Sequence, residues 1–100
     1  MRLDIYDRER KTFDLPDQPT EVISNPEREF AAQIAWDAMI MGWEKAVTVN
    51  ARLMQVSLHR VVDILDRAAD YNDKADPQGR IHELEDWKLE RQERSRLKVR

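Results

Sequence analysis

The feature that most constrains the fold is a line of apolar residues at helical spacing between Pro26 and Asn72. This stretch has no internal proline after Pro26 and a single glycine, Gly42. Its apolar side chains recur three, four or seven positions apart, which is the spacing of one side of an α-helix. We call this line the apolar seam, and it consists of Trp36, Ile40, Trp43, Val47, Met54, Leu58, Val61, Leu65 and Ala68. The sequence therefore predicts a mainly α-helical chain.

Two places in this stretch are candidates for a turn, Gly42 and residues 47–50. One glycine costs about 1 kcal/mol inside a helix and does not force a bend. Residues 47–50 hold two valines and a threonine, where a loop between helices is usually polar or contains glycine. The seam keeps its phase across both places and has one irregular step, between Met54 and Leu58. We predict one long amphipathic helix over 26–72, with a hairpin of two shorter helices as the alternative.

A second apolar stripe lies beside the first part of the seam. It consists of Phe30, Ile34, Ala38 and Met41, which also follow helical spacing. Two apolar stripes on one helix require two partners, and we expect one of them to lie within the chain.

The start of the long helix carries two overlapping cap signals. Asn25 is a possible N-cap before Pro26, and Ser24 is another, with Glu27 in capping-box spacing. The polar, breaker-rich residues 72–79 end the helix, and a short charged C-terminal helix is expected to begin after Asp76.

The N-terminal residues alternate between apolar and polar. Leu3 and Ile5 form one alternating pair, and Phe13 and Leu15 form another. Alternation of this kind is typical of strands, so we predict a small β-hairpin over 1–16. An isolated hairpin is only marginally stable in water, so it should pack against the long helix. Residues 16–23, which contain two prolines, should form an extended connector.

Length and composition indicate a single helical domain over 1–90, followed by a basic and flexible tail over 91–100. The chain has no cysteine, and its first residues are charged rather than apolar. No apolar run is long enough to span a bilayer. We therefore expect a cytoplasmic protein without membrane contact.

The residues that carry chemistry are sparse. His59 and Asp63 are four positions apart, as are His82 and Asp86, which is the spacing of ordinary surface pairs on helices. Only two glycines are present, which excludes a glycine-rich phosphate loop. We expect no enzymatic activity, no metal and no cofactor.

The seam instead favours a small binding or assembly protein that forms a homodimer or higher oligomer and presents a surface to another protein. Asn50 falls on the seam, where an amide can fix the register of paired helices or turn to water. The predicted interface consists of Trp36, Ile40, Trp43, Val47, Asn50, Met54, Leu58, Val61 and Leu65.

Two alternatives remain open. The first is nucleic-acid binding by the basic tail, through Arg91, Arg94, Arg96, Lys98 and Arg100. The second is a pocket between subunits for a small anionic ligand, formed by Trp36 or Trp43 with arginines such as Arg52 or Arg60.

Overall fold

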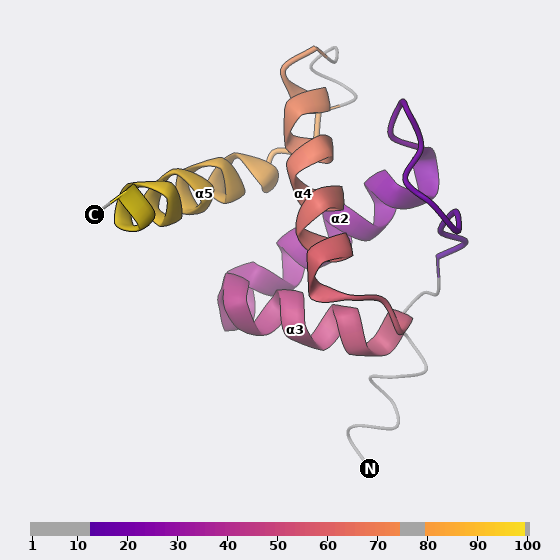
Figure 1. Cartoon of the computed structure of the whole chain (residues 1–100), viewed down its shortest axis with the longest axis horizontal. Helices are drawn as coiled ribbons and strands as arrows, with labels where there is room; N and C mark the ends of the chain where they lie inside the picture. The colour runs from indigo at the N-terminus through magenta and orange to yellow at the C-terminus, as the bar shows by residue number, and fades with distance from the viewer. Residues whose placement is uncertain (1–12, 75–79, 100) are drawn as a thin grey trace.

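Four helices make up most of the part of the chain that the structure describes, which is residues 13–74 and 80–99, with only the backbone for 94–99. In this computed structural model the helices are α2 (Asn25–Met41), α3 (Trp43–Met54), α4 (Leu58–Asn72) and α5 (Leu84–Val99). Helices α2, α3 and α4 pack against one another, and α5 leads away from them to one side (Figure 1).

The prediction of a single long helix over 26–72 is wrong, because the chain turns twice within it. At Gly42 the backbone has φ 88° and ψ 158°, a conformation that residues with a side chain rarely adopt. At Gln55 it is left-handed, with φ 57° and ψ 44°, and Ser57 then caps the next helix. Three helices therefore replace the predicted one.

The physical reason for the turns is burial of apolar surface within the chain. An unbroken helix over 26–72 would be roughly 70 Å long at 1.5 Å per residue. The folded molecule measures 42 × 31 × 26 Å, so the chain has folded back on itself and covers much of the seam. The second turn falls between Met54 and Leu58, at the one irregular step of the seam.

The predicted β-hairpin is also wrong where it can be compared with the structure. Its first strand lies outside the described residues, and within 13–74 and 80–99 no residue is in a strand. Phe13 and Leu15 instead belong to a segment without regular structure that runs from 13 to 24 and that we call the strap. The Phe13 ring lies 5.6 Å from the ring of Phe30, so the alternation reflects packing on α2 and not strand pairing.

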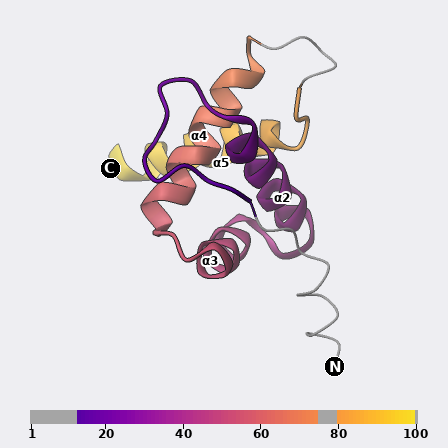
Figure 2. The ribbon, with the colours of Figure 1, turned by 90° about the vertical axis from the view of Figure 1, so that its right-hand side faces the viewer.

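The hydrophobic core lies where α2, α3, α4 and the start of α5 meet. Phe30 and Ile34 of α2, and Ile64 and Leu65 of α4, are completely buried there. The remaining buried apolar residues are Ile23, Ala31, Ala35, Trp43, Ala46, Val47, Ala51, Val61, Ala68, Ala69, Leu84 and Trp87. Figure 1 shows α4 crossing α2, and Figure 2 shows α3 end-on near the lower ends of both helices.

Side-chain caps fix the starts of α2 and α4. The Ser24 hydroxyl accepts a hydrogen bond from the Glu27 N–H, and the Glu27 carboxylate accepts one from the Ser24 N–H. This is the capping box, so the prediction that uses Ser24 is confirmed over the one that uses Asn25. Ser57 caps α4 by accepting a hydrogen bond from the Arg60 N–H.

The first turns of α5 are docked on the other helices. The Trp87 ring lies 5.0 Å from the Trp43 ring, and its indole N–H donates to Asp66 at 2.8 Å. The Trp43 indole N–H donates to Asp86 at 2.9 Å. Each buried tryptophan thus packs its ring in the core and directs its N–H to a carboxylate, as amphipathic aromatic residues usually do.

Candidate functional site

An exposed apolar surface lies on the side of α2 that faces away from the core. Trp36, Met39 and Ile40 are 59%, 68% and 73% exposed, and their spacing of three and four puts them on one side of the helix. We call these three residues the outer face of α2. A tryptophan, a methionine and an isoleucine side by side in water form a contiguous apolar patch, which in soluble proteins often marks an interaction site.

The outer face exists because α2 is apolar on both sides between Phe30 and Met41. The second apolar stripe, which includes Phe30 and Ile34, faces the core. With that stripe buried, the seam residues Trp36 and Ile40 are directed to the opposite side, where no described helix covers them.

Two hollows extend the outer face at its ends. The hollow at one end, of about 420 Å³, is lined by Phe13, Glu29, Ala32, Gln33 and Trp36. The hollow at the other end, of about 470 Å³, lies between α2 and α5, and we call it the α2–α5 hollow. It is lined by Met39, His82, Glu83, Glu85, Asp86 and Leu89.

The α2–α5 hollow combines apolar and acidic residues. Met39 and Leu89 give it an apolar surface, and Leu89 is 61% exposed. Three carboxylates, from Glu83, Glu85 and Asp86, line the same hollow. The apolar surface therefore continues from α2 onto α5 and is bordered there by negative charge.

The predicted interface residues are divided between the core and the surface. Trp43, Val47, Asn50, Val61 and Leu65 are buried within the chain, Met54 is half-buried, and Trp36, Ile40 and Leu58 are exposed. The structure thus keeps Trp36 and Ile40 together on one exposed face, whereas Leu58 is at the start of α4. Met39 and Leu89 belong to the exposed surface and were not predicted, although Met39 has helical spacing from Trp36.

Asn50 belongs to a polar cluster between α2 and α3. Its amide N–H donates to the Asp37 carboxylate and to the Ala46 carbonyl, both at 2.9 Å. Its amide oxygen accepts a hydrogen bond from Gln33 at 3.1 Å. Asn50 and Asp37 are buried, so these bonds link the two helices inside the chain.

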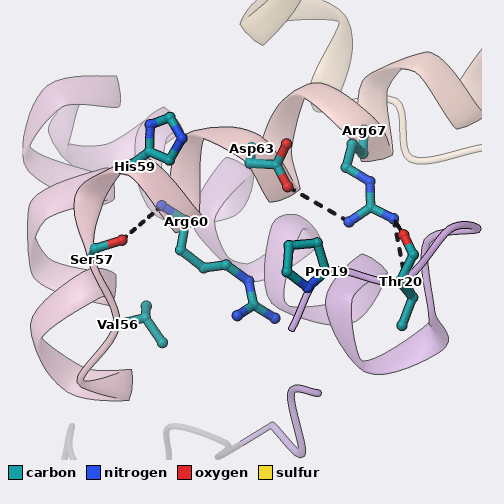
Figure 3. Close-up of a pocket in the computed structure, with 8 residues that line it drawn as sticks. All are labelled: Pro19, Thr20, Val56, Ser57, His59, Arg60, Asp63 and Arg67. Atoms are coloured by element: carbon teal, nitrogen blue, oxygen red, sulfur yellow. Dashed lines mark hydrogen bonds and ion pairs between the residues drawn. The ribbon is translucent and has the colours of Figure 1, made fainter. Parts of the chain in front are cut away.

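A separate cleft, of about 550 Å³, lies between the strap and α4 (Figure 3). Its lining is Pro19, Thr20, Val56, Ser57, His59, Arg60, Asp63 and Arg67. The described residues around it include neither Trp36 nor Trp43, so the predicted combination of a tryptophan with Arg60 is not brought together within one chain.

The two arginines of this cleft hold the strap in place. Arg60 donates to the Pro16 carbonyl at 2.7 Å, and Arg67 donates to the Thr20 carbonyl. Both guanidinium groups also lie near the buried Glu27 carboxylate, at 3.7 Å and 3.4 Å. This cluster is an internal clamp, and it was not predicted from the sequence.

The pKa of Glu27 reflects this clamp. Burial by itself raises the pKa of this carboxyl, but hydrogen bonds from Ser24 and Thr20 and the charge of Arg67 outweigh burial. The pKa of Glu27 therefore lies below its ordinary value, so the ionised form is favoured in the folded protein.

The carboxylates of the two predicted His–Asp pairs have other partners. Asp63 forms an ion pair with Arg67 at 3.6 Å, and Asp86 accepts the hydrogen bond from Trp43. Within residues 13–74 and 80–93, no three His, Asp or Glu side chains are close enough together to bind a metal ion.

The basic segment 91–100 continues the helix of α5 through Val99. Arg91 lies 3.1 Å from Asp66 and 3.7 Å from Asp70, so it joins α5 to α4. The half-buried Lys88 and the exposed Asp73 form a further link at 2.7 Å, which lowers the pKa of Asp73 and raises that of Lys88.

Comparison with protein families, with curated proteins and with solved structures finds no match to this chain. Among the helices that the structure describes, none combines the length and the apolar character needed to cross a membrane.

Proposed function

We propose that this protein is a small non-enzymatic assembly protein that forms a homodimer through the outer face of α2 and presents its remaining surface to another protein. The observation that carries the proposal is the exposure of Trp36, Met39 and Ile40 side by side on one helix. The second stripe of α2 already fills its side of the core. One chain therefore does not need the outer face to complete its fold, which supports the same proposal.

The size of the apolar surface fits a two-fold contact. At the exposed fractions given above, Trp36, Met39, Ile40 and Leu89 together present roughly 500 Å² of surface. Two copies that cover this surface mutually would remove about 1,000 Å² from water, before the surrounding polar residues are counted. Specific interfaces bury about 1,200–2,000 Å² in total. The apolar surface thus supplies most of a small dimer interface.

A second copy is favoured as the occupant because a two-fold contact pairs the same patch with itself. Trp36 and Ile40 are neighbours on one helix, so two α2 helices that cross can each place Ile40 against the partner's tryptophan ring. Aromatic residues and methionine are the side chains most enriched in such contacts.

The experiment that tests the proposal is size-exclusion chromatography with light scattering on the full chain, from about 1 to 100 µM. We expect a dimer whose dissociation constant rises at least tenfold in Ile40→Ser. Val22→Ser is the matched control, because Val22 is 71% exposed but belongs to the strap. The control should dimerise as the wild type does. A monomeric wild type at 100 µM, or a dimer that Ile40→Ser leaves unchanged, would refute the proposal.

A further inference from the structure

We infer that the basic C-terminal half of α5 from one copy lies in the α2–α5 hollow of a second copy, and that the second copy reciprocates. This inference rests on the proposed self-association and adds the contact that fixes how the two copies are oriented. The charge pattern of α5 and the geometry of one rigid helix support it independently of the outer face, and the hollow shares only Met39 with that face.

The first support is the chemistry of the hollow. Its volume of about 470 Å³ is bordered by the side chains of Met39 and Leu89, and by three carboxylates. Glu85 is 3.8 Å from Arg80 and 3.9 Å from Lys88, which are long ion pairs on the surface. Surface pairs of this kind contribute little and exchange readily with other cations. The hollow is therefore suited to an amphipathic helix that carries positive charge.

The second support is the charge pattern along α5 and the turn before it. Residues 82–90 contain four acidic side chains and one lysine, Lys88. Residues 91–100 contain five basic side chains and one acidic one, Glu93. Two such helices in antiparallel orientation place the basic end of each beside the acidic start of the other. Parallel helices would instead oppose like charges, which is unfavourable.

The third support is that the basic segment of a chain cannot occupy the hollow of the same chain. The hollow is lined by residues 82–89, and the basic segment follows on the same helix, with residue 96 about 15 Å along the axis from residue 86. A continuous helix cannot turn back onto its own first turns. Figure 1 shows the end of α5 at the margin of the molecule, away from α2, where a second copy can reach it.

A simpler cause of the charge pattern is the helix dipole, which favours acidic residues at the start and basic residues at the end of any helix. The dipole acts within one chain and stabilises the monomer. The proposed contact acts between chains and changes only the dimer. A charge-reversal experiment separates these two effects.

The experiment uses two variants of the full chain. In the hollow variant, Glu83→Lys is combined with Glu85→Lys, and Asp86 is kept because it binds Trp43. In the arm variant, Arg94→Glu, Arg96→Glu and Lys98→Glu are combined, and Arg91 is kept because it binds Asp66. Each variant alone opposes like charges, so its dimer dissociation constant, measured by light scattering, should rise about tenfold or more.

The decisive measurement is the equimolar mixture of the two variants. In a mixed dimer the basic hollow faces the acidic arm, and the acidic hollow faces the basic arm. The mixture should therefore dimerise within about threefold of the wild-type dissociation constant, whereas neither variant does so alone. A chain that carries all five substitutions should also recover, because its own hollow and arm are again complementary. Because these reversals also oppose the helix dipole, the helical content of the mixture by circular dichroism should equal the average of the two variants measured alone.

The possible outcomes distinguish this inference from the proposed function. If Ile40→Ser weakens the dimer and neither charge reversal does, this inference alone is overturned. If the charge reversals change dimerisation as expected and Ile40→Ser does not, this inference is supported and the role of the outer face is overturned. A monomeric wild type overturns both. If duplex DNA binds the wild type with steep salt dependence and not the arm variant, while the mixture fails to recover dimerisation, the basic segment contacts nucleic acid instead.

Discussion

Helices α2 and α4 are of similar length and cross each other in the core, yet they differ on the sides that face away from it. The outward side of α4 carries charged residues such as Asp63 and Arg67, and Arg67 pairs with Asp63 and holds the strap. The outward side of α2 carries Trp36, Met39 and Ile40. Both helices bury apolar residues equally well, but only α4 has a solvent-facing side that is suited to water.

Burial in the core and apolar character are therefore separate properties of a helix. Apart from Leu58 at its first position, the apolar residues of α4 are buried or half-buried within one chain. α2 has enough apolar residues for two contacts, and the described part of the chain supplies one of them.

The largest effect should come from the core side of α4. Leu65 is completely buried, so Leu65→Ala leaves a cavity and should lower the free energy of unfolding by about 2–5 kcal/mol. Urea denaturation monitored by circular dichroism measures this change. Ile40→Ala on the outer face is the comparison and should alter the unfolding of the monomer by no more than about 0.5 kcal/mol. Equal losses at the two positions would show that the two helices do not differ in this way.

The next effect concerns the residue that ends α2. Gly42 has φ 88° and ψ 158°, and a Cβ at this position would meet no atom within 4 Å. Gly42→Ala should therefore cost about 1–3 kcal/mol through backbone strain alone, without a steric clash. Alanine also favours an unbroken helix, so the variant should populate a form in which α2 and α3 are fused. Thermal unfolding and chromatography would detect these two effects. A variant as stable and as compact as the wild type would contradict the prediction.

The polar cluster between α2 and α3 should contribute less. Asn50→Leu removes the hydrogen bonds that Asn50 makes with Asp37 and Gln33. Loss of a buried hydrogen-bond partner should lower stability by about 1–2 kcal/mol. A double-mutant cycle with Gln33→Leu measures how much of this loss belongs to the pair. If Asn50→Leu raised stability, Asn50 would instead behave as a register-setting amide at a contact between subunits.

The smallest of these effects depends on pH and concerns the clamp that joins the start of α2 to α4. Because the pKa of Glu27 is lowered on folding, its contribution to stability is complete above its unfolded value of 4.5 and is lost as the pH falls through the folded value. Glu27→Gln should cost about 1 kcal/mol at pH 7 and make the loss of stability below pH 4.5 less steep. Urea midpoints at several pH values measure both. Glu29→Gln, an exposed neighbour, is the control and should change neither.

The sequence contained enough information for the helical class, for a cap at either Ser24 or Asn25, and for the two apolar stripes of α2. The periodicity of Phe30 and Ile34 predicts burial within the chain, and these residues are in the core. The periodicity also indicated which side of a helix faces the core, but it did not indicate where the helix ends. A turn at Gly42 depends on how well the folded-back helices pack, and this energy comes from residues far apart in the sequence.

Contacts between residues that are far apart in the sequence could not be predicted either. Arg67 contacts Thr20 and Glu27, which are 47 and 40 positions away, and nothing local in the sequence marks such a pairing. Leu89 is an isolated leucine among charged residues, and only the docking of Trp87 places it beside Met39. The one local signal of the second turn was the irregular step between Met54 and Leu58.

The three tryptophans give the molecule an optical label for each of its parts. Trp43 and Trp87 are in contact, with ring centroids 5.0 Å apart and the rings inclined by 54°, so their excited states should couple and produce a paired band in circular dichroism. That band would vanish if α5 detached, even with every helix intact. Trp36 is 59% exposed and should dominate quenching of fluorescence by a soluble quencher such as iodide. Shielding of Trp36 as the concentration rises would then report contact at the outer face, while the coupled band reports α5 independently.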